Sequence, residues 1–298
     1  MHENEINKFK GTGVAIITPF HREGSIDFKS FENLIEYQIN GGVNYIVFLG
    51  TTGESVTLNQ DEKNAVINFG IEIVNDRVPV VVGMGGNNTR QVVKDIKSTD
   101  FTGISAILSV SPYYNKPQTK GIFNHYKSIA GQSPVPVIIY NVPGRTSSNI
   151  DSNTTLRIAH ELNNVIAVKE ASGDLSQVSR IINGKPDDFL VISGDDALTL
   201  PFMAIGGDGV ISVIANAFPQ EFSKMVSHCL ENNYQAAREI HFKLFDLIES
   251  IYADGSPSGV KALLEIKGLA KNFLRLPLAK INKGLYNQIN LLNEKFNS

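Results

Sequence analysis

The sequence contains a single cysteine in 298 residues, Cys229, so no disulfide can form within the chain and no thiolate cluster can hold a metal. Cys229 lies in a segment with helical periodicity, where a buried and unreactive thiol is expected. The chain also lacks an excess of positive charge, since its formal net charge is −3. Nucleic-acid and membrane-surface binding usually need a basic patch, so neither is expected.

Long apolar runs are missing as well. No run approaches the ~20 residues that a membrane-spanning helix needs, and residues 1–13 have no apolar stretch of the signal-peptide type. No linker, internal repeat or low-complexity segment divides the chain. Apolar residues make up 42% of it and charged residues 19%, which is typical of a globular protein with a large core. We therefore expect one compact protein located in the cytoplasm.

What the sequence does contain is a series of short β-rich runs separated by segments with helical periodicity. The runs are nearly continuous in apolar residues, which is typical of parallel strands covered on both faces. Eight strands that each precede a helix predict a (β/α)8 TIM barrel. The eight runs are residues 13–20, 45–50, 78–85, 104–111, 136–143, 165–172, 190–196 and 209–215.

The chain continues well beyond the eighth run, and its remaining residues carry further helical patterns. We assign the first part of this tail to the eighth barrel helix and the rest to a helical appendage. The predicted organisation is a barrel over residues 1–232 and a C-terminal helical region over residues 233–298 that packs on it.

Polar and turn-forming residues gather at the ends of several predicted strands. In a barrel of this kind the active site lies at the carboxyl ends of the strands. Each group taken alone could simply turn the chain or cap a helix, but five at one end predict an active site. They are "GTTGES" (50–55), "SPYYNKP" (111–117), "YNVPGR" (140–145), Lys169 and "SGDD" (193–196).

Lys169 ends the apolar run "VIAV" and is the least expected of these residues. Side chains alternate along a strand, so Val165, Ala167 and Lys169 should share the barrel-facing side, while Glu170 faces the helices. A buried lysine without a matched carboxylate tends to lose its proton, and the neutral amine can form an imine with a carbonyl compound. The alternative is that Lys169 reaches solvent past the end of the strand.

Metal and nucleotide sites have little support. None of the six histidines falls at a predicted strand end, which disfavours a metal-dependent aldolase. The glycine-rich stretch "GMGGNNT" (83–89) lacks the G-x-G-x-x-G spacing of dinucleotide-binding loops and has no P-loop lysine. We expect neither a metal nor an organic cofactor.

With these residues in place, the chain resembles the dihydrodipicolinate synthase family, which belongs to the pyruvate-dependent class I aldolases. The motifs "GTTGES", "PYYNKP", "YNVPGR", "KEAS", "SGDD" and "GVISV" occur in family order on the expected strands. The resemblance runs from about residue 11 to the end of the eighth strand and weakens in the tail. It implies that pyruvate condenses with L-aspartate 4-semialdehyde, a step of lysine biosynthesis through diaminopimelate.

The resemblance also implies roles for four catalytic residues. Lys169 matches the lysine that forms an imine with pyruvate, and Tyr140 matches the tyrosine that acts as general acid and base. Thr51 and Tyr114 match its partners in a proton relay, in which the tyrosine is usually supplied by a neighbouring subunit. The family is commonly a homotetramer built from two dimers, so the same assembly is expected here.

Four further positions match the family's substrate-binding residues. Thr52 and Ile211 match positions that bind pyruvate, Thr52 through the carboxylate, and Gly194 lines the same pocket. Arg145 matches the arginine that holds the carboxylate of the semialdehyde.

Two other functions compete with this interpretation. Sister aldolases that act on N-acetylneuraminate or a 2-keto-3-deoxy sugar acid keep the lysine and the tyrosine. Arg145 favours a short acidic aldehyde over a polyol. A non-catalytic barrel that senses a keto acid would be expected to lose the lysine, the tyrosine or the threonine, and all three are present.

Inhibition by lysine is a further property of some members, and here the resemblance weakens. Lysine-sensitive bacterial members tend to have histidines at the positions of Gln60 and Lys63 and a glutamate at that of Gln91. The missing glutamate and the added positive charge predict weak or absent inhibition. The matching positions are Ser55, Val56, Gln60, Lys63, Asn87, Gln91 and Tyr113.

Overall fold

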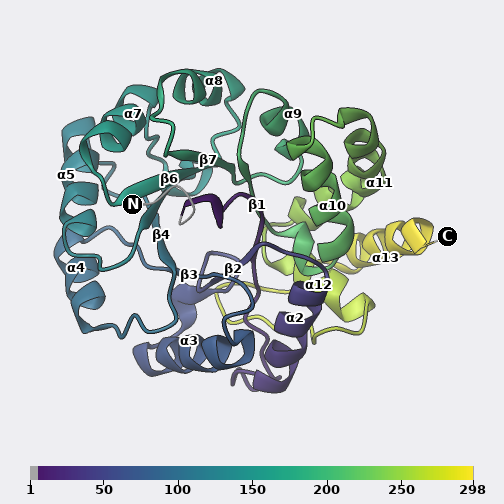
Figure 1. The fold of residues 1–298 in the computed structure, drawn as a ribbon. Helices are drawn as coiled ribbons and strands as arrows, with labels where there is room; N and C mark the ends of the chain where they lie inside the picture. Colours follow the sequence, from purple (N-terminus) through teal and green to yellow (C-terminus); the bar gives the residue numbers. More distant parts are fainter. Residues whose placement is uncertain (1–5, 298) are drawn as a thin grey trace.

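A computed structural model describes residues 6–297, and in it eight parallel strands close into a barrel in chain order (Figure 1). Each strand pairs with the next, and the eighth pairs with the first. The predicted (β/α)8 architecture is thereby confirmed. The strands are β1 (Gly11–Ala15), β2 (Tyr45–Phe48), β3 (Val80–Gly83), β4 (Ala106–Val110), β5 (Val137–Asn141), β6 (Val165–Glu170), β7 (Leu190–Ser193) and β8 (Gly209–Ser212).

Helices follow the strands and form the outer ring of the barrel (Figure 1). Several begin at an Asp or Asn whose side chain accepts a hydrogen bond from the first helical turn, as at Asp27, Asn59 and Asp151. The helices are α2 (Phe28–Asn40), α3 (Gln60–Val74), α4 (Thr89–Ser98), α5 (Thr119–Ala130), α6 (Pro143–Thr146), α7 (Ser152–Glu161), α8 (Leu175–Gly184), α9 (Thr199–Ala204) and α10 (Pro219–Leu230), with short 3₁₀ turns η1 (Ser55–Thr57) and η2 (Ile214–Asn216).

The first strand differs most from its predicted range. The apolar run was expected to form a strand over residues 13–20, but β1 begins at Gly11 and ends at Ala15. Beyond it the amide of Ile17 donates to the side-chain oxygen of Asn216 (3.0 Å) instead of to a neighbouring strand. The rest of the run stays buried in the outer core, where Phe20 forms only an isolated antiparallel bridge with Ile26, so hydrophobicity alone overestimated the strand.

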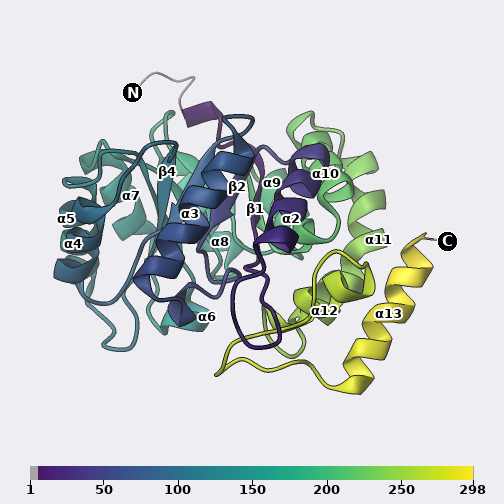
Figure 2. The same ribbon diagram turned by 90° about the horizontal axis from the view of Figure 1, so that it is seen from below.

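A separate hydrophobic cluster fills the inside of the barrel, and the N-terminal segment closes one end of it. Ile6 and Phe9 belong to this cluster, and the Phe9 ring meets Tyr45 edge-on with the ring centroids 5.7 Å apart. Figure 2 shows the first described residues at one end of the barrel and α6 at the opposite end. The carboxyl ends of the strands therefore lie at the end of the barrel opposite the N-terminal segment.

The sixth strand carries a bulge that corrects the predicted side-chain alternation. Val137 pairs with Val165, whereas the next residue of β5, Ile138, pairs with Ala167, so β6 holds one extra residue. Val165 lies in the outer cluster against the helices, and Ile166 and Ala167 both lie in the inner cluster. Val165 therefore does not share the inward face predicted for it.

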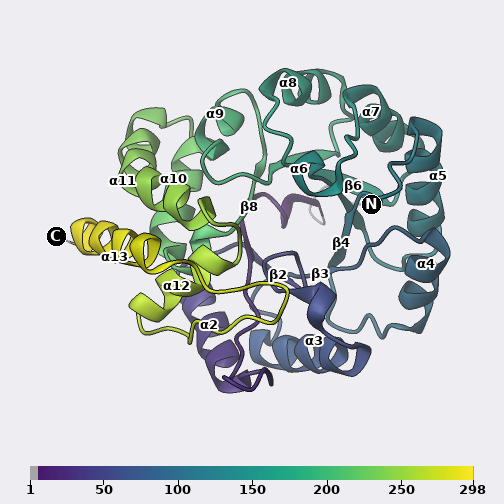
Figure 3. The ribbon, with the colours of Figure 1, turned by 180° about the vertical axis from the view of Figure 1, so that it is seen from behind.

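The C-terminal region adds α11 (Tyr234–Tyr252), α12 (Ser258–Ile266) and α13 (Lys283–Asn297). In Figures 2 and 3, α12 and the long connection to α13 lie toward the end of the barrel that carries α6. One hydrophobic cluster contains Phe222 of α10, Leu247 of α11 and Leu263 of α12. The predicted division at residue 232 falls between α10 and α11 and stays a prediction.

Within residues 6–297, no helix combines the length and the apolar character that crossing a membrane requires. The cytoplasmic location stays a prediction.

Candidate active site

Lys169 lies on β6 between Tyr140 of β5 and Ile192 of β7, which are its partners in the strand register. It is only 6% exposed, and its Nζ lies 4.4 Å from the centre of the Tyr140 ring. The alternative in which this lysine reaches past the strand end into solvent therefore does not hold. The amine is held inside the barrel, against an aromatic side chain.

Glu170, the neighbour of Lys169, is part of a different network. Its carboxylate accepts hydrogen bonds from the side chains of Asn141 and Gln177 (both 2.9 Å) and from the amide of Ser172 (2.7 Å). Val168 belongs to the outer cluster. The prediction that Glu170 would not pair with Lys169 agrees with this geometry.

The surroundings of Lys169 favour a neutral amine at moderately alkaline pH. Burial lowers the pKa of Lys169 to about 8, the carboxylate of Asp196 opposes this shift, and the positive charge of Arg145 adds to it. A substantial fraction of the amine is therefore neutral near pH 8, and the neutral amine is the form that attacks a carbonyl.

Asp196 is the residue that sequence reasoning missed. It is buried after β7, where its carboxylate accepts hydrogen bonds from the amides of Val213 (3.0 Å) and Ile214 (2.8 Å). The hydroxyl of Tyr252, at the end of α11, donates to it as well (3.1 Å). Burial raises the pKa of Asp196, so these donors are needed to hold its charge. The motif "SGDD" drew attention to this loop but did not show that a buried carboxylate there influences the pKa of Lys169.

Tyr140 is also enclosed, being 7% exposed. Burial raises the pKa of Tyr140 to about 12, while the charge of Arg145 and a hydrogen bond with Thr51 act in the opposite direction. The hydroxyl is therefore protonated at neutral pH and can serve as an acid, and its link to Thr51 offers a path for the proton.

The loop after β2 holds Thr51 and Thr52 in a tight double turn. The amide of Gly53 donates to the carbonyl of Gly50, and the amide of Glu54 donates to that of Thr51 (both 3.1 Å). Thr51 is exposed, whereas Thr52 is buried. The loop thus leaves Thr51 accessible to solvent while its side chain contacts the hydroxyl of Tyr140, and it encloses Thr52.

Gly194 lies directly against Lys169. A Cβ at Gly194 would lie 2.7 Å from the Cβ of Ala171 and 3.0 Å from the Cε of Lys169, so a larger residue would displace the lysine. Ile211 of β8 is 1% exposed and belongs to the inner cluster.

Arg145 and Tyr114 lie at the edge of this group. Arg145 is on the short helix α6, exposed, with a guanidinium nitrogen 3.5 Å from the carbonyl oxygen of Ser256. Tyr114 is 83% exposed and adopts φ = +74°, a left-handed conformation that is rare for a bulky residue. Tyr114 is therefore not enclosed with Lys169 and Tyr140 within this chain.

A (β/α)8 barrel with a buried lysine amine beside a tyrosine, at the carboxyl ends of its strands, defines a lyase of the class I aldolase type. The model of the Dihydrodipicolinate synthetase family matches residues 8–294. The chain belongs to this family.

Two curated relatives share half of the aligned sequence. A 4-hydroxy-tetrahydrodipicolinate synthase from Flavobacterium psychrophilum is 50% identical over 287 residues, covering 96% of this chain and 98% of the relative. One from Parabacteroides distasonis is 50% identical over 280 residues, covering 94% of each.

Solved structures agree with the fold. A dihydrodipicolinate synthase from Thermotoga maritima superposes with a TM-score of 0.95 at 38% identity, covering 97% of this chain and 99% of that one. The enzyme from Cyanidioschyzon merolae with lysine bound gives 0.94 at 34% identity, with the same coverage.

Proposed function

We propose that the protein condenses pyruvate with L-aspartate 4-semialdehyde to 4-hydroxy-tetrahydrodipicolinate, a step of lysine biosynthesis, through an imine on Lys169. The observation that carries this proposal is the buried amine of Lys169, with a pKa of about 8, packed on Tyr140. The family to which the chain belongs supports the same substrates.

The first half of the reaction activates pyruvate. The neutral amine of Lys169 attacks the keto carbon, and loss of water leaves a protonated imine. This imine withdraws electrons, so the methyl group can lose a proton and become an enamine. Tyr140 exchanges the protons, with Thr51 of the same chain and Tyr114 supplied by a neighbouring subunit as its relay partners. The imine itself is the electron sink, so no cofactor is required.

The second half joins the two substrates and releases the enzyme. The enamine carbon attacks the aldehyde carbon of the semialdehyde. The amino group of that substrate then attacks the imine carbon, closes the ring and displaces Lys169 as a free amine. We assign the pyruvate pocket to Thr52, Gly194 and Ile211 and the semialdehyde carboxylate to Arg145, whose guanidinium can bind it bidentately.

The test of this function is a comparison of substrates with the purified protein. We expect pyruvate and L-aspartate 4-semialdehyde to be consumed together, as followed by NMR, and N-acetylneuraminate to be cleaved at least about a hundredfold less efficiently. The reason is Arg145, a cation at the rim that suits a short carboxylate substrate. Comparable cleavage of the sugar acid would assign the protein to the sister aldolases.

We also propose that the protein acts as a homotetramer of two dimers. The exposed Tyr114, held in a left-handed conformation, is placed where a neighbouring subunit could receive it. One structural neighbour is described as a monomeric variant, so the family tolerates other states.

A lysine titration of initial rates should show weak inhibition or none, with half-inhibition above about 1 mM, which corresponds to about −4 kcal/mol of binding free energy. Gln91 is neutral and its side chain donates to Asp95 (2.7 Å), so it offers no carboxylate to an incoming ammonium. Lys63 adds a like charge, and two such charges ~4 Å apart near a surface repel by up to roughly 4 kcal/mol. Half-inhibition well below a millimolar would show that Lys63 and Gln91 do not control this property.

A further inference from the structure

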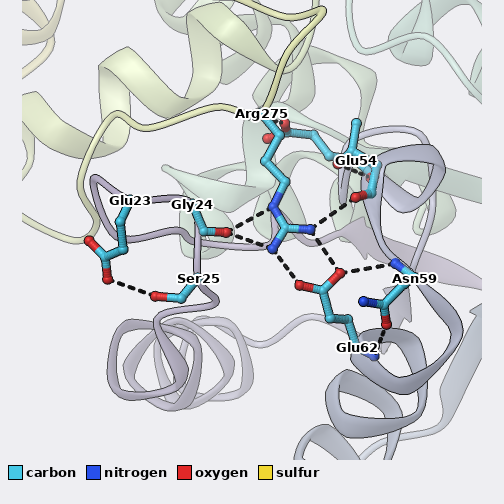
Figure 4. Close-up of polar contacts among 8 residues, drawn as sticks. Glu23, Gly24, Ser25, Glu54, Asn59, Glu62 and Arg275 are labelled. Carbon is cyan, nitrogen blue, oxygen red and sulfur yellow. Dashed lines mark hydrogen bonds and ion pairs between the residues drawn. The ribbon is translucent and has the colours of Figure 1, made fainter.

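The C-terminal region reaches across the molecule to the loop that carries Thr51 and Thr52. Two of its cations make this contact, Lys261 on α12 and Arg275 in the connection to α13. Figure 4 shows Arg275 between the loop at Gly24, the N-terminus of α3 at Glu62, and Glu54. Glu54 is the last residue of the double turn that contains the two threonines.

Both oxygens of the Glu54 carboxylate are held by the C-terminal region. Oε1 lies 2.5 Å from the Nζ of Lys261, and both side chains are fully buried. Oε2 accepts a hydrogen bond from the backbone amide of Arg275 (3.1 Å). The Nζ of Lys261 donates in addition to the carbonyl of Phe273 (2.8 Å), which ties α12 to the following segment.

The guanidinium of Arg275 fixes the position of that segment. It binds both carboxylate oxygens of Glu62, at 2.5 and 2.8 Å, and donates to the carbonyls of Gly24 and Thr57 (Figure 4). The ring of Phe20 lies against both cations, with its centre 4.3 Å from the Nζ of Lys261 and 4.6 Å from the Cζ of Arg275.

The backbone of Glu54 needs such an anchor. Its φ is +53° and its ψ is 33°, a left-handed conformation that is unfavourable for a residue with a side chain. In this conformation its amide donates to the carbonyl of Thr51 (3.1 Å). A displacement of Glu54 would therefore be transmitted directly to Thr51 and, through the same turn, to Thr52.

A buried ion pair contributes little net stability, because removing two charges from water offsets most of their attraction. The value of the Lys261–Glu54 pair therefore lies in the geometry that it imposes. We propose that Glu54 is a positioning residue for pyruvate binding, and that the C-terminal region holds it there through Lys261 and Arg275. This inference rests on the proposed function, in which Thr52 binds pyruvate and Thr51 relays its proton.

The test replaces the pair without leaving a buried charge unpaired. In Glu54→Gln/Lys261→Met both side chains keep their approximate size, so the fold should survive. We expect the KM for pyruvate to rise about tenfold or more, since small displacements in an active site have large kinetic effects. The KM for the semialdehyde should change by less than about twofold, because Arg145 lies on a different loop.

A second pair of variants separates positioning from general stability. Arg275→Met should also raise the KM for pyruvate. Arg77→Met is its matched control, since Arg77 likewise binds both oxygens of a glutamate, Glu36, and two backbone carbonyls. Arg77 precedes β3, at the opposite end of the barrel, so its loss should lower the melting temperature without changing either KM.

The outcomes distinguish this inference from the proposed function. If the unmodified protein neither traps pyruvate nor consumes the semialdehyde, the proposed function fails. If it does both, and the double variant keeps a normal KM for pyruvate, the positioning role of Glu54 is wrong. A fall in kcat that merely matches the loss of folded protein, with both KM values unchanged, would also show that the Lys261–Glu54 pair only stabilises the structure.

Discussion

Lys169→Ala should abolish the trapping of pyruvate by borohydride and lower turnover by about a thousandfold or more, because the variant has no amine to form the imine. In the unmodified protein the reduced adduct should map by mass spectrometry to the peptide that contains "VIAVKEAS", residues 165–172. Trapping by the variant, or an adduct on another peptide, would show that a different lysine forms the imine.

Lys261 provides an internal control for this experiment. It is as deeply buried as Lys169, and burial likewise lowers its pKa to about 8. Its side chain, however, is fully buried and its Nζ is 2.5 Å from a carboxylate oxygen of Glu54, so a carbonyl compound cannot reach it. We expect no adduct on the Lys261 peptide. A lowered pKa therefore does not identify the reactive lysine unless the amine is also free to reach a carbonyl.

The pH dependence of trapping is a second signature of Lys169. Below its pKa of about 8 the amine is mostly protonated and unreactive, and above it the amine is mostly neutral. At low pyruvate concentration the trapping rate should therefore rise with pH and level off above about 8. A rate that kept rising toward pH 10 would indicate a lysine with an ordinary pKa.

Arg145→Ala should leave imine trapping nearly intact and lower kcat/KM for the semialdehyde by about 2–4 kcal/mol, or roughly 30- to 900-fold. Arg145 is exposed on α6, and its guanidinium is not part of the enclosed group around Lys169. The loss should therefore fall on the second substrate. Its charge also helps to lower the pKa of Lys169, so the pH at which trapping levels off should move upward.

Two variants sharpen this prediction. Arg145→Lys should recover only part of the efficiency, since an ammonium group cannot bind a carboxylate bidentately. Arg157→Ala removes an exposed arginine from α7 that pairs with Glu161, and it should leave both substrates unaffected. Near-normal efficiency of Arg145→Ala with the semialdehyde would remove Arg145 from the binding site.

The sequence predicted best those features that depend on residues close together in the chain. Continuous apolar runs located all eight strands, and the placement of Lys169 at the end of one of them indicated an unusual amine. The ends of the strands were less certain, since β1 stops where Asn216 takes over the hydrogen bond of Ile17. That bond joins residues far apart in the chain, and no short pattern encodes it.

The same limit explains what was missed around the site. The carboxylate of Asp196, whose charge opposes the fall in the pKa of Lys169, is held in place by the amides after β8 and the hydroxyl of Tyr252. The contact of Lys261 with Glu54 likewise joins the C-terminal region to the second strand loop. Each of these contacts depends on the closed barrel, so only the tertiary structure reveals them.

The extra residue in β6 has a consequence for how the strand presents its charges. Counting from Val165, which faces the helices, strict alternation would direct Lys169 outward and Glu170 inward. The bulge reverses the facing of every residue after it. The side chain of Lys169 therefore points into the barrel, and that of Glu170 points toward the helices. The extra residue is therefore what reconciles an outward Val165 with an inward Lys169: without Ile166, regular alternation would run from Val165 outward through Ala167 inward to Lys169, which would still face inward.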